Sequence, residues 1–249
     1  MRKLAAALAC RNVGARLYGK PLQNIDVDSG ITILDQILST LRTLRCLDAI
    51  VLGISEGNHN LAFIDFARAN GLEFIVGDEK DVLHRLIQCG DKVQATDIFR
   101  VTTESPFLYF EPVAASWKDH VDRNADATFI DHIIDGTGFE IIKLDALKRS
   151  HREGEDRHHS ELCTLYIREN KDKFAINLVK APPALMRKDL RLTVDYPEDL
   201  IVCRAVYKNF RPKAPLIPVS EIIEYLDHHP KLVELIAPFC EEGYKSMYF

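Results

Sequence analysis

The sequence lacks several features that would assign it to common protein classes. No CxxC pair occurs among its 6 scattered cysteines, so neither a paired-cysteine zinc site nor a small disulfide scaffold is indicated. No apolar run approaches the ~18 residues of a membrane span. The net charge of −5 provides no global basic field for nucleic acid. We therefore expect a protein that binds neither nucleic acid nor a membrane.

The amino-terminal stretch can be interpreted in two ways. Arg2 and Lys3, followed by a small apolar run and Cys10, are similar to a short secretion signal that ends at a lipidated cysteine. Leu4–Ala9 is, however, shorter than the roughly 7–15 apolar residues that such a signal needs. A strand needs only about 5–6 residues. We therefore predict a strand here, and a cytoplasmic protein whose cysteines are buried thiols.

Apolar and amphipathic segments alternate through the first half of the chain. The continuous apolar runs are typical of parallel strands covered on both faces. Strands are predicted for "KLAAALAC", "DAIVLGIS", "EFIVG" and "DIFRVT", and helices for "ITILDQILSTLRTLR", "HNLAFIDFARANG" and "EKDVLHRLIQCGDKVQA". This repeated β-α-β pattern predicts an α/β fold with an open, mostly parallel sheet.

The rhythm changes after Pro112. We predict a helix from Val113 to about Arg123, then strands in "FEIIK", "FAINLV" and "LRLTV". Asp195 is expected to cap a helix that begins in "DYPEDL", because aspartate is a favoured N-cap. A last amphipathic helix, "SEIIEYLDHH", is expected to have Ser220 as its cap.

The loop "CRNVGARLYGKPL" after the first strand is basic and contains glycine. Arg11, Arg16 and Lys20 carry positive charge, while Gly14 and Gly19 allow the backbone to approach a ligand. Ligands of open α/β sheets bind beyond the carboxyl ends of the strands, where these cations suit a polyphosphate. The loop matches neither GxxxxGK[ST] nor GxGxxG, and a solvated basic loop is the alternative.

Four blocks of the chain resemble, in order, the SpsF-like and acylneuraminate cytidylyltransferases that make CMP-sugars. The blocks are "ACRNVGARLYGKPL", "GDEKDVLHRL", "FRVTTESPF" and "LRLTVDYPEDL", and the resemblance covers about residues 3–209. It implies a Rossmann-like nucleotide-diphospho-sugar transferase (GT-A-like) fold in residues 1–210. A small acceptor and dimerisation arm is expected at about 126–180, and a C-terminal helical extension at 211–249.

The resemblance also implies roles for individual residues. The implied catalytic residues are Lys20 and Arg16; the nucleotide-binding residues Arg11, Asn12, Gly14, Arg16, Lys20, Asp81 and Arg85; the acceptor-binding residues Arg100, Glu140 and Glu161; and the Mg²⁺ ligands Glu104 and Asp195. Such a protein would join CTP to an anionic sugar or sugar-like acceptor, release pyrophosphate and form a homodimer.

Two departures from the family pattern keep alternatives open. Glu104 replaces the usual aspartate, and Leu162 replaces a histidine of the acceptor region. The alternatives are a nucleotidyltransferase that uses another nucleotide or a phosphate or phosphonate acceptor, and a non-catalytic binding protein on the same fold. The histidine doublet at 158–159 can bind a metal. Adjacent side chains on a helix diverge, however, so we favour the interpretation that both histidines are surface residues without a metal. The glycines of "DGTG" indicate either a phosphate loop or a turn.

Overall fold

The computed structural model describes residues 2–14 and 16–247, with side chains as far as Gly243. Its main feature is a seven-stranded sheet in the order β5-β4-β1-β6-β8-β7-β9. The strands are β1 (Leu4–Cys10), β4 (Ala49–Ser55), β5 (Glu73–Gly77), β6 (Asp97–Arg100), β7 (Ala127–Ile130), β8 (Glu140–Lys143) and β9 (Ile176–Val179). Only β8 pairs antiparallel with its neighbours, so the predicted mostly parallel α/β sheet is confirmed.

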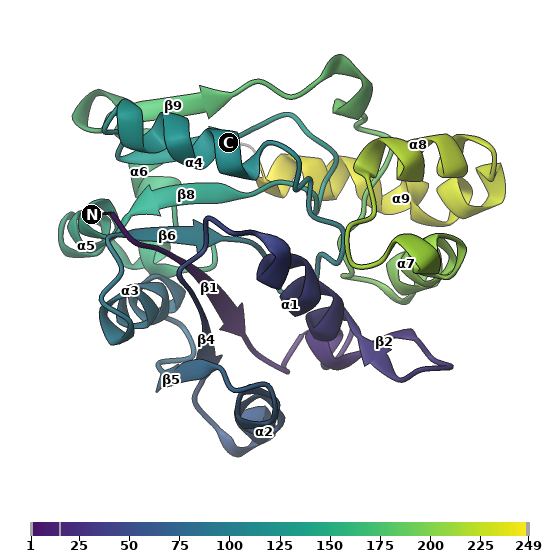
Figure 1. Cartoon of the computed structure of the whole chain (residues 1–249), viewed down its shortest axis with the longest axis horizontal. Helices are drawn as coiled ribbons and strands as arrows, with labels where there is room; N and C mark the ends of the chain where they lie inside the picture. Colours follow the sequence, from purple (N-terminus) through teal and green to yellow (C-terminus); the bar gives the residue numbers. More distant parts are fainter. Residues whose placement is uncertain (1, 15, 248–249) are drawn as a thin grey trace.

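Helices cover both faces of this sheet (Figure 1). The helices are α1 (Ile33–Thr43), α2 (Leu61–Ala69), α3 (Val82–Lys92), α4 (Val113–Asp122), α5 (Leu144–Glu153), α6 (Leu165–Glu169), α7 (Pro197–Phe210), α8 (Val219–Asp227) and α9 (Pro230–Met247). A short hairpin of β2 (Asn24–Asp26) and β3 (Ile31–Thr32) precedes α1. Among the helices of the described residues, none is long and apolar enough to cross a membrane.

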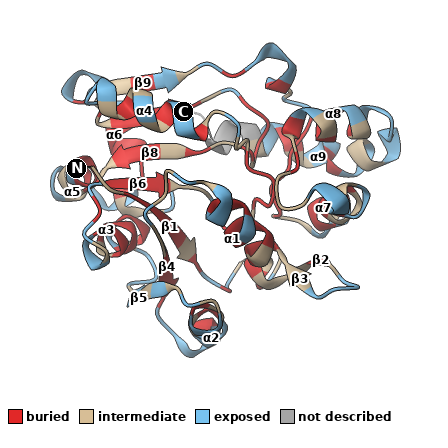
Figure 2. Ribbon diagram, viewed as in Figure 1, coloured by how far each residue is buried: buried red, intermediate tan, exposed pale blue. Residues whose placement is uncertain are grey.

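The alternation of side chains along β1 divides the core into two layers. Leu4, Ala6 and Leu8 face a cluster that includes residues of α1, α2, α7 and α8, while Ala5 and Ala7 face α3, α5 and α6. Every one of these strand residues is fully buried, and Figure 2 shows the central strands buried in the same way. The alanine-rich strand therefore lies in the middle of the molecule, as its sequence predicts.

The direction of the chain changes at β1. From β1 it passes through α1 to β4 and through α2 to β5, then returns through α3 to β6 on the other side of β1. The loops that follow β1 and β6 consequently leave the sheet at the same end, which is where open α/β sheets bind their ligands. Figure 1 shows α7, α8 and α9 grouped at this same end.

Three details of the second half differ from the sequence predictions. The "LRLTV" segment forms only an isolated bridge between Arg191 and Asp135, because the neighbouring chain there is a loop. Helix α7 has Tyr196 as its N-cap, and α8 begins at Val219 after Pro218, so neither Asp195 nor Ser220 caps a helix. The last helix is α9, which lies within the predicted helical extension 211–249 but follows "SEIIEYLDHH", the segment expected to be the last helix.

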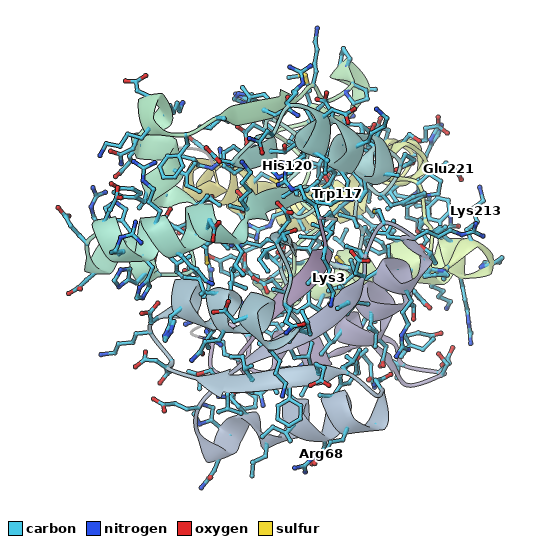
Figure 3. The ribbon with its side chains drawn as sticks, turned by 60° about the vertical axis from the view of Figure 1, so that its left-hand side comes forward. Lys3, Arg68, Trp117, His120, Lys213 and Glu221 are labelled. Atoms are coloured by element: carbon cyan, nitrogen blue, oxygen red, sulfur yellow. The ribbon has the colours of Figure 1, made fainter. Side chains whose placement is uncertain are left out.

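A buried ionic cluster lies at the end of the sheet where β6 begins. Asp97, at the start of β6, accepts a 2.8 Å hydrogen bond from Nε of Arg2 and lies 3.2 Å from Nε2 of His120. His120 lies beside Trp117 on α4, with ring centroids 5.7 Å apart (Figure 3). Burial raises the pKa of Asp97, but the bonds from His120, Arg2 and Thr96 outweigh it and hold that pKa below its usual value.

We expect Asp97→Asn to lower the free energy of unfolding at pH 7 by about 3 kcal/mol, because Arg2 and His120 would lose a buried charged partner. The contribution of a carboxylate with a lowered folded pKa is present above its unfolded pKa of about 3.9. This contribution disappears as the pH falls through the pKa of the folded state. The difference in free energy of unfolding between the variant and the wild type should therefore become smaller in acid. Urea unfolding at several pH values measures this.

Asp122→Asn is the matched control, because it removes an exposed carboxylate of α4 that pairs with Lys118. Surface pairs contribute little, so this variant should unfold like the wild type. Equal stabilities of the two variants at pH 7 would contradict the role given to Asp97.

Candidate active site

A cavity of about 350 Å³ opens at the edge of the sheet where β1 and β6 end and β8 begins. Segments from both halves of the chain line it, including the loop after β1, the loop after β6, the start of β8 and α9. Of the residues singled out in the sequence, Arg11, Asn12, Gly14, Arg16, Lys20, Arg85, Arg100, Glu104, Glu140, Glu161 and Asp195 line this cavity. The fold therefore brings residues as far apart as Arg11 and Asp195 to one place.

The basic loop after β1 is folded back onto the protein. The backbone NH of Asn12 donates to Oδ1 of Asn60 at 2.8 Å, and its side-chain amide donates to the carbonyl of His59. The carbonyl of Asn12 accepts from the NH of Gly19 at 2.8 Å, which closes the loop. Lys20 then begins a 3-10 turn (η1, Lys20–Leu22). These contacts argue against a freely solvated loop and fix its cations at the cavity.

Asp195 lies among three cations. Its Oδ1 is 2.5 Å from Nζ of Lys20 and 3.4 Å from the guanidinium of Arg16, while its Oδ2 accepts from Arg191 at 2.7 Å. Burial raises the pKa of Asp195, but the hydrogen bond and charge of Lys20, with Arg16 and Arg191, lower it below its usual value. Asp195 is therefore ionised at neutral pH. Arg16 also donates to the hydroxyl of Tyr196 at 3.1 Å.

Glu104 lies in the loop after β6 and its carboxyl belongs to the same group of charges. The NH of Val194 donates to the carbonyl of Glu104 at 3.0 Å, which ties the two loops together. Burial raises the pKa of Glu104, Asp195 raises it further, and Lys20 opposes both. The ammonium of Lys20 thus lowers the pKa of both carboxyls, which are the pair that the resemblance implies as Mg²⁺ ligands.

Arg191 holds the carboxyl-terminal side of the cavity together. Its guanidinium is buried and lies 2.7 Å from Asp195, 3.1 Å from Asp199 and 3.9 Å from Asp135. It also donates at 2.8 Å to the carbonyl of Phe239 in α9. Three aspartates thus share one buried cation, and Asp195 is also paired with Lys20 and Arg16.

Helix α9 is part of the cavity wall, although the sequence analysis treated residues 211–249 only as an extension. The ring of Phe239 stacks on Tyr196 with centroids 3.9 Å apart. Gly243 also lines the cavity, and a Cβ there would lie only 2.5 Å from Oδ2 of Asp135. The absence of a side chain at Gly243 lets the helix approach this carboxyl.

The "DGTG" segment forms a tight turn that packs on the residues before Asp195. Gly136 has φ of 88°, and a Cβ there would lie 2.5 Å from the NH of Thr193. The preceding Asp135 is buried, which raises its pKa to about 6; Arg191 opposes this shift, whereas the nearby acids add to it. Of the two predicted interpretations, the geometry favours the turn.

The predicted acceptor side is a network of arginines and carboxylates. Arg100 donates at 2.7 Å to Glu140, which also pairs with Arg168 at 3.0 Å. Arg11 is 2.8 Å from the carboxylate of Glu161, and Arg100 donates to the carbonyl of Glu161 at 2.8 Å. Burial raises the pKa of Glu140, but Arg100 and Arg168 outweigh it and lower that pKa.

Two predicted nucleotide-binding residues have other contacts. Asp81 does not line the cavity; it caps α3 by accepting from the NH of His84 at 2.8 Å. Arg85 lines the cavity but is buried, and it donates to the carbonyls of Cys10 at 3.2 Å and Gly53 at 2.9 Å. Arg85 therefore fixes the ends of β1 and β4, and Asp81 lies outside the cavity.

Sequence reasoning missed Asp135, Arg168, Arg191 and the contribution of α9. One signal was available, because Arg191 is a charged residue inside the apolar run "LRLTV". A charge in such a run is seldom buried without a partner. No local signal identifies Gly243.

Comparison with known proteins identifies relatives by sequence and by fold. No protein-family model matches this sequence. The spore coat polysaccharide biosynthesis protein SpsF of Bacillus subtilis is 24% identical over 232 residues, covering 92% of this chain and 96% of SpsF. The chain is thus similar to SpsF along almost its whole length.

Two solved structures are similar to the whole fold. A cytidylyltransferase from Leptospira borgpetersenii superimposes with a TM-score of 0.83 at 19% identity, covering 94% of this chain and 97% of the other. A CMP:2-keto-3-deoxy-manno-octonic acid synthetase solved with CTP has a TM-score of 0.63 at 14% identity, covering 83% and 99%. The Rossmann-like fold and the SpsF-like resemblance predicted from the four sequence blocks are confirmed.

We expect Asp135→Asn to stabilise the protein at pH 8. A carboxyl whose folded pKa is raised to about 6 binds a proton more tightly when folded, so its stabilising contribution is lost as the pH rises through that value. An amide avoids this loss, which amounts to about 3 kcal/mol at 1.36 kcal/mol per pKa unit. Urea unfolding at pH 8 and pH 4 measures it. A stabilisation that is as large at pH 4 would contradict the explanation.

Proposed function

Given the similarity to SpsF and the fold shared with cytidylyltransferases, we propose that this protein is a nucleotidyltransferase that uses CTP. Its acceptor would be an anionic sugar or sugar-like molecule, and its products a CMP-linked compound and pyrophosphate. The observation that carries the proposal is the convergence of Arg11, Arg16 and Lys20 on a cavity that Glu104 and Asp195 also line.

The chemistry follows from these charges. An acceptor oxygen attacks the α-phosphorus of CTP, the new P–O bond forms, and the bond to the β-phosphate breaks to release pyrophosphate. Negative charge builds on the phosphoryl oxygens, so fixed cations around them lower the barrier. Arg11 and Arg16 are suited to the triphosphate, because guanidinium groups bind phosphate in a fixed geometry. Lys20 supplies a compact charge at the centre of the loop.

The residues present fit a magnesium ion. Glu104 and Asp195 offer hard carboxylate oxygens, and Mg²⁺ needs one or two of these because it keeps several waters. The ammonium of Lys20 lies 2.5 Å from Asp195 and acts on Glu104, so this position already accommodates a cation. When bound, the ion would neutralise phosphate charge. The longer Glu104, in place of the family's aspartate, then remains compatible with the site.

Acceptor recognition is assigned to the arginine network. Arg11 and Arg100 both contact Glu161, and Arg100 also reaches Glu140. An acceptor carboxylate or phosphate that replaced Glu161 as the partner of Arg11 would bind beside the nucleotide loop. This supports an anionic acceptor and leaves the choice between a nonulosonic acid and a phosphorylated compound to an acceptor screen.

The oligomeric state and the location of the protein stay predictions. A homodimer through the arm is favoured by β9, an edge strand on which Leu178 is 66% exposed. A cytoplasmic location agrees with the six free cysteines of the described chain.

Lys20→Ala should reduce turnover by about 10²–10³-fold with little change in thermal stability, because one preorganised charge contact is lost. Pyrophosphate release from CTP, measured beside ATP, GTP and UTP with a panel of acceptors, gives the readout. Lys118→Ala, an exposed lysine of α4, is the control and should retain full rate. A Lys20 variant with near-normal rate would exclude a catalytic role for this loop.

Glu104→Gln and Asp195→Asn should each lose Mg²⁺-dependent activity, because two carboxylates facing a triphosphate repel it unless a cation lies between them. Glu104→Asp keeps the charge and should retain part of the rate. Titration of activity and of CTP affinity with Mg²⁺ measures this. If Glu104→Gln responds to Mg²⁺ like the wild type, Glu104 is not a ligand.

CTP binding without turnover of any acceptor would favour the alternative of a non-catalytic binding protein.

A further inference from the structure

A second cluster of polar side chains lies outside the cavity, at the amino-terminal end of α3. Oδ2 of Asp81 is 2.7 Å from Nε2 of His151, near the end of α5. One ligand atom from each of Asp81, His84 and His151 lies within 4.8 Å of the other two. The three residues come from two helices separated by about 60 positions, so only the fold brings them together.

A third histidine adjoins the cluster. The ring of His159 stacks on His151, with centroids 4.2 Å apart and planes at 14°. Its Nδ1 is 3.8 Å from Oδ2 of Asp81, and its Nε2 is 3.1 Å from the carbonyl of His151. His159 ends the short 3-10 helix η3 (Asp156–His159), which belongs to the loop that leads to Glu161.

The chemistry of this cluster differs from that of the cavity. Imidazole nitrogens with one carboxylate oxygen suit a borderline ion such as Zn²⁺, whereas Mg²⁺ prefers oxygen alone. Asp78 and Glu79 precede Asp81 with Lys80 between them, so this stretch keeps a net negative charge, which favours a cation. The carboxyl of Asp81 is already oriented, because its Oδ1 accepts from the NH of His84 at 2.8 Å.

We propose that Asp81, His84 and His151 bind one Zn²⁺, and that His159 lies against it as a fourth ligand or as a partner of Asp81. Bond lengths of about 2.0–2.1 Å require ligand atoms roughly 3.4 Å apart, so the separations of up to 4.8 Å must contract. His84 is exposed, and its ring centroid already lies 5.2 Å from that of His151, so a change of its side-chain rotamer can bring the nitrogen closer. Coordination would replace the present hydrogen bond between Asp81 and His151.

The ion would connect the two parts of the molecule that form the cavity. Asp81 and His84 belong to α3, whereas His151 and His159 flank the segment that leads to Glu161. Glu161 in turn contacts Arg11 and Arg100 at the cavity. A bound Zn²⁺ would therefore hold the 151–161 segment against α3 and fix the position of Glu161. Binding of Zn²⁺ itself does not depend on the proposed function.

The test uses the full-length chain without a histidine tag, treated with a chelator and dialysed. Titration calorimetry with zinc chloride should give one ion per chain, also in excess Mg²⁺. His84→Ala and His151→Ala should each weaken binding by at least about tenfold, since loss of a ligand costs no less than loss of an outer partner. The exposed His228→Ala, at the end of α8, is the matched control and should bind like the wild type. Circular dichroism checks that each variant is folded.

Two further measurements test the coordination geometry of the ion and its effect on the segment that leads to Glu161. Co²⁺ in place of Zn²⁺ should give the strong visible absorption of a four-coordinate site, and this should be absent in His151→Ala. Hydrogen exchange should slow in residues 154–162 on addition of Zn²⁺. Equal Zn²⁺ affinity in the wild type, His84→Ala and His151→Ala would overturn the site. Binding without slower exchange would overturn its connection to Glu161.

Discussion

The buried guanidinium of Arg191 is the contact on which the cavity most depends. It is the shared partner of Asp135, Asp195 and Asp199, and it also reaches the backbone of α9. These groups come from the turn after β7, the segment before α7, the first turn of α7 and the last helix. A single charge thus connects four segments of the chain, and Asp195 is also paired with Lys20 and Arg16.

The remaining geometry follows from the reversal of chain direction at β1. Parallel strands that end at the same edge bring the loops after β1 and β6 together, and the antiparallel β8 starts at that edge, so Arg100 pairs with Glu140 across the sheet. One side of the cavity is consequently rich in the cationic side chains of the loop after β1. The other is a balanced network of arginines and carboxylates, in which an incoming anion must compete with an internal one.

Much of the fold could be predicted from sequence because local patterns agree with tertiary burial. The run of alanines in β1 is apolar throughout and is buried on both faces, and the cations of the following loop do reach one cavity. Glu104 and Asp195, which were singled out from short blocks, line the same cavity. Residues whose roles depend on distant partners were not singled out, as Arg191 and Asp135 illustrate.

The misassigned elements have specific physical reasons. "LRLTV" has the composition of a strand, but its neighbours are turns, so almost no ladder forms. The carboxylate that accepts from the backbone at the start of α7 is that of Asp199, at 2.9 Å from the NH of Tyr196, rather than that of Asp195. Helix α9 lies within the predicted helical extension but was not delimited as a separate helix, and it contains Pro238, a residue that disfavours a helix interior.

The position of α9 has a practical consequence for handling the protein. Strand β1 carries the chain from the buried Asp97 cluster at one edge of the sheet to the cavity at the other, about 20 Å away at 3.3 Å per residue. The start of β1 therefore lies on the side remote from the cavity, whereas Gly243 of α9 lines it. A truncation or substitution within α9 consequently alters a wall of the cavity, so this helix must be kept intact in any shortened version of the protein.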